Sequence, residues 1–294
     1  MTRPSAPHRT IPTRRMYFDE SLRLLPRHFA FDGDLISSHL VAALSAVFPE
    51  GEEYFVRSVR HYRDRVTDPA LKRQIAGFIG QESMHGRAHR AFNNRLAELG
   101  YPTRIVDRIV RLALKFRERV MSPMANLGTT AALEHFTATL AALVLTDPEV
   151  RDSIGHQGVR DLFVWHALEE SEHKAVAFDV FRAMGGTERT RRWTMNGITL
   201  FFVIGMAFQI GLSLLLDRDT YRRGVLRQSW HSFRETPLMR PDVWRKLRDY
   251  NRPGFHPDDY DTTELEESWR TRLFGENGSL NDKLIAGVSG DRVA

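Results

Sequence analysis

The run from Trp165 to His173 places three residues of metal-ligand type, His166, Glu170 and His173, at the spacing H-x-x-x-E-x-x-H. On a helix this spacing brings all three side chains to one face, and that face is otherwise mostly apolar from Val159 to Met184. Burying an ionised carboxylate is very unfavourable unless it is paired or bound to a cation, so Glu170 between two imidazoles indicates a metal site. The alternative for this helix alone is structural, with the imidazoles bound to water and Glu170 in a salt bridge.

A second helix carries the same residue types at the spacing E-x-x-H. The Asp-Pro pair at 68–69 is a helix-start signal, a capping residue followed by proline at the first helical position. The helix that it opens keeps one apolar face as far as Leu99, and the polar residues on that face are Glu82, His85 and His89.

Two further helices each carry one inward glutamate. Glu52 lies on the apolar face of its helix, whereas Glu53 lines up with arginines and is expected in water. The Ser-Pro pair at 122–123 repeats the start signal, and Glu134 is the lone charge on the apolar face of the helix that follows.

These four helices together carry four inward carboxylates and three inward imidazoles in the order Glu, E-x-x-H, Glu, E-x-x-H. The order predicts a helical bundle whose core binds two metal ions. Carboxylates can bridge two cations, and imidazole suits iron and other mid-row metals, so we expect iron, with manganese or zinc as alternatives. Structural salt bridges remain the alternative to a metal centre. The predicted metal ligands are Glu52, Glu82, His85, Glu134, His166, Glu170 and His173.

His89 lies one turn beyond His85 and exceeds this set of seven ligands. We treat it as the candidate catalytic residue, a proton relay. The alternatives are an eighth ligand or a side chain that orients a ligand imidazole. Glu169 and Glu172 flank the ligand face and are expected in water or paired to Lys174 and arginines.

The ligand order resembles that of the ferritin-like di-iron carboxylate proteins, and the third imidazole is similar to the ligand set of the p-aminobenzoate N-oxygenase type. Most of residues 17–260 is similar to a bacterial family described as predicted metal-dependent hydrolases. That similarity rests on the strings GEEYFVRSVRHY, QESMHGRAHRAFN, EHFTA, WHALEESEHKAVAFDV and YNRPGFHP. The resemblance implies a ferritin-like four-helix bundle with a dimetal core, and the family's G-E-x-x-F pattern implies Glu52 as a ligand.

Composition narrows the class of protein. The chain of 294 residues has no cysteine, so disulfides are excluded and any metal must bind His, Asp or Glu. The net charge of +5 comes from scattered arginines without a basic and aromatic module, so nucleic acid is not an expected partner. No segment alternates like a strand and the N-terminus lacks a secretory signal. We therefore expect an all-α cytoplasmic protein, with membrane association as an alternative.

The expected organisation is a basic disordered tail over residues 1–16, a ferritin-like metal-binding bundle over 17–186, an apolar helix and an irregular C-terminal segment of the same domain over 187–275, and a flexible tail over 276–294. Pro49 is expected to interrupt the first long helix, because proline breaks or kinks helices. The Arg-rich segment Ile105 to Val120 is predicted to be a covering helix with Ile109, Leu112 and Phe116 inward.

Residues 196–216 contain no charged residue and are long enough to cross a bilayer at about 1.5 Å per residue. Glycine and polar residues dilute the apolar run, so three interpretations compete: a helix buried in the bundle or a homodimer interface, a helix lying on a membrane surface, and a true span. We expect packing against protein through the more apolar side, formed by Leu200, Val203, Ile204, Phe208 and Leu212.

The function expected from the ligand set is that of a di-iron enzyme that uses dioxygen to oxidise or oxygenate a small apolar organic substrate. The first alternative keeps the site and changes the chemistry, to hydrolysis by a metal-bridging hydroxide. A second alternative is non-enzymatic iron binding or storage.

Overall fold

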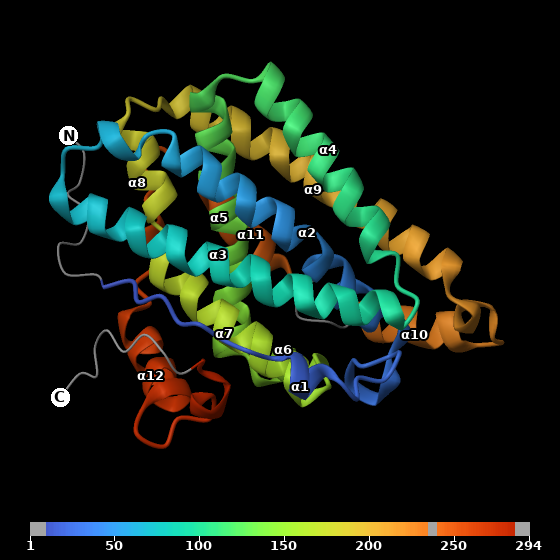
Figure 1. Cartoon of the computed structure of the whole chain (residues 1–294). Helices are drawn as coiled ribbons and strands as arrows, with labels where there is room; N and C mark the ends of the chain where they lie inside the picture. Colours follow the sequence, from blue (N-terminus) through green and yellow to red (C-terminus); the bar gives the residue numbers. More distant parts are fainter. Residues whose placement is uncertain (1–9, 235–239, 286–294) are drawn as a thin grey trace.

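Every regular element that the computed structural model describes, over residues 10–234 and 240–285, is a helix (Figure 1). Within those ranges the only extended pairing is an isolated bridge between Met16 and Leu284. The prediction of an all-α chain is therefore confirmed.

The helices follow one another along the chain in the order shown by the colours of Figure 1. The first part of the chain forms α1 (Asp19–Leu22), α2 (Leu35–Arg60), α3 (Pro69–Glu98), α4 (Thr103–Val120), α5 (Pro123–Thr146) and α6 (Pro148–Ser153). The second part forms α7 (Gln157–His173), α8 (Val176–Ala183), α9 (Glu188–Leu216), α10 (Val225–Arg234), α11 (Pro241–Asp249) and α12 (Thr263–Phe274).

The expected start signals begin two of the long helices. The Asp68 side chain accepts a hydrogen bond from the backbone N–H of Ala70 at 2.8 Å, and α3 starts at the proline between them. The Ser122 hydroxyl accepts from the N–H of Ala125 at 3.2 Å in the same way at the start of α5. These caps satisfy backbone donors that have no partner within the helix.

Helix α2 continues through Pro49, so the interruption expected there is wrong. Proline cannot donate the hydrogen bond that the carbonyl of Ser45, four residues earlier, would accept in a regular helix. The side chain of Asn93 on α3 replaces that donor, because its Nδ2 lies 2.9 Å from Ser45 O. The neighbouring helix thus removes much of the cost of the proline and keeps Glu52 in one helix with residues 35–48.

The helices that carry the predicted ligands pack as two pairs, α2 with α3 and α5 with α7, and α2 and α3 lie side by side in Figure 1. Their apolar side chains form two clusters. On α3, Phe78 belongs to the first cluster and Phe92 to the second. Glu82 and His85 lie between these two phenylalanines in sequence, so the ligand residues occupy the seam between two halves of the core.

The helix that carries H-x-x-x-E-x-x-H ends at His173, and α8 starts at Val176, so the continuous helix expected here is wrong. Lys174 at the break is buried. Its Nζ donates to the carbonyl of Tyr260 at 2.5 Å and to the hydroxyl of Thr262 at 2.7 Å. These bonds hold the break against the C-terminal segment.

Residues 10–16 are placed along α3, so disorder is the wrong expectation for this part of the N-terminal segment. A side chain at Gly77 would collide with Ile11, and one at Gly80 would collide with Thr13. The two glycines therefore let the segment cross α3 at close range.

The C-terminal segment after α9 is more regular than expected, because it contains α10, α11 and α12. Pro241 does not prevent a helix here, because it occupies the first turn of α11, where proline is favourable. The expected flexible tail is placed as far as residue 285, where the N–H of Ile285 donates to Arg15 O at 2.9 Å. The outer parts of both expected tails, residues 1–9 and 286–294, lie outside the described residues.

Among the described helices, α9 alone is long and apolar enough to cross a membrane by length and composition, which is weak evidence for a span. It packs along α5 and α2. The expectation that the more apolar side is buried is wrong: Leu200 and Phe208 are each 59% exposed, whereas Thr194, Met206 and Ser213 are buried.

Candidate metal centre

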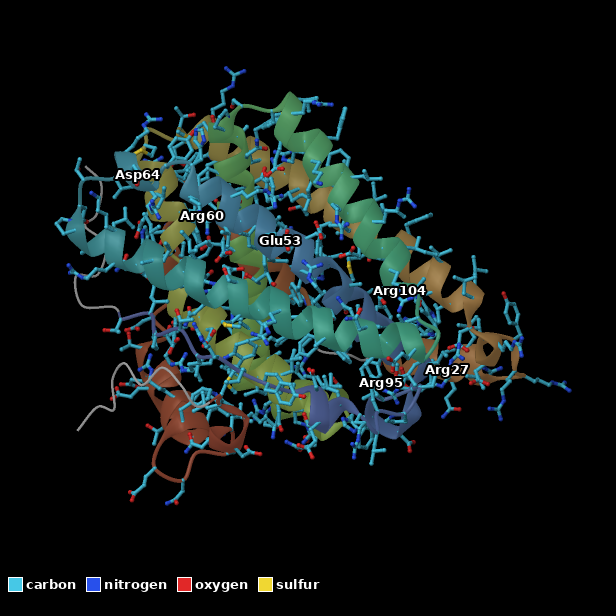
Figure 2. All side chains as sticks on the ribbon, viewed as in Figure 1. Arg27, Glu53, Arg60, Asp64, Arg95 and Arg104 are labelled. Atoms are coloured by element: carbon cyan, nitrogen blue, oxygen red, sulfur yellow. The ribbon has the colours of Figure 1, made fainter. Side chains whose placement is uncertain are left out.

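All seven predicted ligands come together between α2, α3, α5 and α7. They form two neighbouring groups of buried side chains, and within each group one ligand atom per residue lies within 4.8 Å of the others. The first group is Glu52, His85 and His166, and the second is Glu82, Glu134, Glu170 and His173. Glu53, the neighbour of Glu52, is 53% exposed and pairs with Arg90 on the outside of the bundle (Figure 2).

Glu170 joins the two groups. Its Oε1 lies 2.9 Å from His166 Nε2 and 3.5 Å from His85 Nδ1 in the first group. The same oxygen lies 3.5 Å from His173 Nε2 in the second group. This carboxylate is therefore placed to bridge two cations.

Many polar atoms of the two groups have no hydrogen-bond partner within the described part of the chain. These atoms are both carboxylate oxygens of Glu52, Glu82 and Glu134, Oε2 of Glu170, Nδ1 of His85 and Nε2 of His173. His173 Nε2 and Glu82 Oε1 are only 3.0 Å apart but lack the angle of a hydrogen bond. Buried polar atoms are rarely left without partners, so this arrangement fits two bound metal ions.

The pKa values of the carboxylates agree with a cation between them. Burial raises the pKa of Glu52, Glu82 and Glu134, that of Glu134 to about 8, and nearby carboxylates raise each further. Glu170 differs: burial opposes its ionisation, but His173, His166 and His85 surround it and hold its pKa well below the usual range. Without a cation, these carboxylates resist full ionisation together.

Outer hydrogen bonds determine which nitrogen of each imidazole faces the centre. His85 Nε2 lies 3.0 Å from Glu169 Oε2, which leaves Nδ1 toward the centre. Burial alone would lower the pKa of His85, but its hydrogen bond to Glu169 and the neighbouring carboxylate of Glu170 raise it to about 10. His173 Nδ1 lies 2.9 Å from Gln81 Oε1, which leaves Nε2 toward the centre. Carboxylate and amide partners of this kind orient metal-binding imidazoles.

Glu169 and Glu172 are fully buried, so the expectation that they lie in water is wrong, whereas the alternative, pairing with arginines, is confirmed. Arg14 donates to both carboxylates at 2.8 Å, and Arg270 donates to Glu172 at 2.9 Å. Arg14 belongs to the N-terminal segment expected to be disordered. This arginine holds Glu169, which in turn is the carboxylate partner of His85.

His89 lies outside both groups, against His166. The two imidazoles meet through Nε2 of His89 and Nδ1 of His166 at 2.7 Å, and Nδ1 of His89 lies 2.9 Å from the hydroxyl of Ser45. Ser45 in turn donates to Asn93 Oδ1 at 2.7 Å. If His166 Nε2 binds metal, each bond of this chain has one donor and one acceptor: His166 Nδ1 donates to His89 Nε2, His89 Nδ1 donates to Ser45, and Ser45 donates to Asn93. This arrangement suits orientation of His166 or proton transfer.

An apolar pocket of about 100 Å³ reaches the centre between α2, α5, α6 and α7. Its wall includes Leu40, Phe48, Leu140 and Phe163, and it also contacts His166 and Glu170. A larger polar hollow of about 250 Å³ lies between α5 and α11, but no predicted ligand lines it. The pocket that touches the ligands is therefore the candidate substrate site.

Sequence reasoning missed Arg14, Gln81, Glu169 and Glu172 as partners of the ligands. One signal was available for the two glutamates. Apolar residues occur on every side of α7 between Val164 and Leu168, and a helix that is apolar all round is buried all round. Nothing in the sequence around Arg14 distinguishes it from its neighbours Arg9 and Arg15.

Replacing Arg14 by Ala is expected to destabilise the fold by about 3 kcal/mol, because it leaves two buried carboxylates short of a cation. Metal affinity should fall by about tenfold, because Glu169 no longer holds His85. Thermal unfolding and metal titration check both effects. Arg15→Ala, at an exposed neighbour, is the matched control. Equal behaviour of the two variants would contradict a role for Arg14 in the centre.

No curated protein and no solved structure matches the chain. The model of one family, described as "Predicted metal-dependent hydrolase", matches residues 12–261. The matched range contains Arg14 and all seven residues of the two groups, so metal dependence agrees with the geometry. Because the match spans most of the 294 residues, the chain belongs to this predicted metal-dependent hydrolase family.

Proposed function

We propose that this protein is a dinuclear metal enzyme that acts on a small apolar organic substrate. The observation that carries the proposal is the position of Glu170, which lies between the two ligand groups and also lines the apolar pocket. A storage site has no need of a substrate pocket in contact with a bridging ligand.

For the reaction, we propose oxidation of the substrate by dioxygen at a di-iron centre. Three imidazoles beside four carboxylates suit mid-row, redox-active metals. When bound, iron would supply the electrons and the site for dioxygen. The chain's own residues would orient the ligands, as Glu169 and Gln81 do for His85 and His173. The apolar wall of the pocket would keep bulk water away from the centre.

His89 has a specific role in this proposal. Burial lowers its pKa well below the ordinary value, and His166 and His85 lower it further, so it is neutral at physiological pH. A neutral imidazole between His166 and Ser45 can accept a proton on one nitrogen and release one from the other. It acts next to the ligands without being one of them.

Metal-dependent hydrolysis is the second candidate, and the family description supports it more directly than it supports oxidation. A metal ion lowers the pKa of bound water and so provides a nucleophile at neutral pH. The same ligands and the same pocket would serve an ester or amide with an apolar group.

Loading the apoprotein with either iron or zinc shows which of the two reactions, oxidation by dioxygen or hydrolysis, the protein catalyses. We expect the reduced iron form to consume dioxygen, measured with an oxygen electrode, and the zinc form to consume none, because zinc has no accessible redox change. The hydrolytic probe is a series of p-nitrophenyl esters. Ester cleavage by the zinc form, without oxygen uptake by the iron form, would overturn oxidation in favour of hydrolysis. A Glu134→Ala variant should lose whichever activity is found.

A further inference from the structure

Helix α4 turns several charged groups toward the protein, next to the inward-facing Val106 and Leu114. Arg111 pairs with Glu50 at 3.0 Å, and Glu118 pairs with Arg57 at 2.8 Å, both across the contact with α2. The opposite side of α4 is apolar and exposed, so the prediction that Ile109, Leu112 and Phe116 point inward is wrong. The exposed apolar residues of α4 are Ile105, Ile109, Leu112, Phe116 and Val120.

Helix α9 also turns some polar groups toward the protein. Thr194 and Ser213 are buried beside Met195 and Met206, and Ile198 and Phe202 pack on the core. Ser213 bonds to His39 of α2 at 2.6 Å, and Thr194 donates to Gly128 O of α5 at 3.2 Å. The exposed apolar residues of α9 are Leu200, Phe201, Val203, Ile204, Phe208, Leu215 and Leu216.

The two helices belong to one side of the molecule. Both pack on α2 and on α5, and Figure 1 shows them running along the same edge of the bundle. We call their exposed apolar residues, named above, the α4–α9 surface. Both helices turn polar as well as apolar groups to the protein and leave a row of large apolar side chains exposed, which is unusual for a protein in water. Exposed apolar surface of this extent marks an interaction surface.

Positive charge borders this surface. On α4 the exposed cations are Arg104, Arg108, Lys115 and Arg119, and within the described part of the chain none of them is paired with an acid. Figure 2 shows Arg104 at the start of the helix. Beyond the end of α9 the exposed arginines are Arg218, Arg222, Arg223 and Arg227. Both acids of α4, Asp107 and Glu118, are paired with arginines on its inner side.

Exposed aromatic residues lie near both ends of α9. Trp193 is near its beginning, and Tyr221 and Trp230 follow its end, each more than half exposed. Tryptophan and tyrosine prefer the level of lipid headgroups, where the ring is apolar and the polar atom meets water. Arginine beside them can bind anionic headgroups.

We propose that the α4–α9 surface docks the protein on a bilayer that contains anionic phospholipid. The apolar side chains enter the outer part of the acyl layer, and the bordering arginines and lysine meet the headgroups. A second copy of the chain fits less well, because a two-fold dimer through this face would bring the two cationic borders together. A span by α9 alone does not fit either, because hydrogen bonds near both of its ends hold its polar side to the bundle.

The test is sedimentation of the full-length, metal-loaded protein with vesicles of phosphatidylcholine, with or without phosphatidylglycerol. We expect binding to the anionic vesicles and several-fold weaker binding to the neutral ones. Ile204→Glu and Phe116→Glu should each weaken binding by about tenfold or more, because a carboxylate would enter the acyl layer. The matched control is Leu24→Glu, at an exposed leucine just after α1. Circular dichroism and metal content would verify that each variant is folded.

Three outcomes would overturn the proposal. If Leu24→Glu weakens vesicle binding as much as Ile204→Glu does, the surface is wrongly assigned. If light scattering shows a wild-type dimer that does not bind vesicles and becomes a monomer in Ile204→Glu, the surface is occupied by a second copy. A wild-type monomer that binds neither kind of vesicle would exclude a lipid surface. None of these results depends on which reaction the metal centre catalyses.

Discussion

Replacing Glu170 by Ala is expected to abolish stable binding at both halves of the metal centre. One oxygen of this carboxylate faces an imidazole of each ligand group, so its loss removes a ligand from both cations and the charge that offsets them. We expect elemental analysis to show about two metal ions per wild-type chain and close to none in the variant.

The matched control for this loss is Glu53→Ala, which removes an exposed glutamate from the same bundle. It should keep the full metal content. Circular dichroism would show whether the Glu170→Ala chain is folded, so that loss of metal is not mistaken for loss of structure. A folded Glu170→Ala protein that keeps both metals would contradict the bridging position.

The metal-free protein is expected to lose stability as the pH rises from about 6.5 to 8, whereas the metal-loaded protein should not. In the fold, Glu134 has its pKa raised to about 8 and His85 to about 10, and that of His173 is also raised. Groups with a raised pKa bind more protons when folded than when unfolded. Their contribution to stability is therefore lost as the pH rises toward the folded pKa.

Below about pH 6.5, the stability of the metal-free protein is not expected to change with pH in one direction only. Burial lowers the pKa of His166 to about 4, so this group makes the folded state more stable as the pH rises from 4 to 6.5. Thermal unfolding of chelator-treated and metal-loaded protein, compared between pH 6.5 and 8, measures the effect. Equal pH dependence of the two forms would mean that the ligand groups are not the origin of the instability.

The ligands could be identified from sequence because charged residues are rare on the buried face of a helix. Glu82 and Glu134 interrupt apolar faces that continue on both sides of them, and periodicity alone reveals such residues. Glu169 and Glu172 do not interrupt one apolar face, and the only local sign of their burial is the apolar run on all sides of α7 just before them. Their partner Arg14 could not be identified, because it lies more than a hundred residues away and no local pattern connects the two segments.

Two other errors have a common physical origin. Periodicity tells which side of a helix is apolar, but it tells which side is buried only if water lies outside. On α4 and α9 large apolar side chains are exposed, with Phe116 at 67% and Phe201 at 68%, and the proposed lipid contact would account for this. The uninterrupted α2 is a different case, because the donor that compensates for Pro49 comes from Asn93 on the next helix.

The two ends of the described chain meet beside the metal centre, since the N–H of Tyr17 donates to Lys283 O and that of Ile285 donates to Arg15 O. Arg14, held next to this junction, precedes every ligand in the chain, and Arg270 follows every one of them. A nascent chain therefore carries all seven ligands before Arg270, one of the two cations that neutralise Glu172, has been synthesised. On this view, the surroundings of the metal centre reach their final charge balance only after α12 has been made.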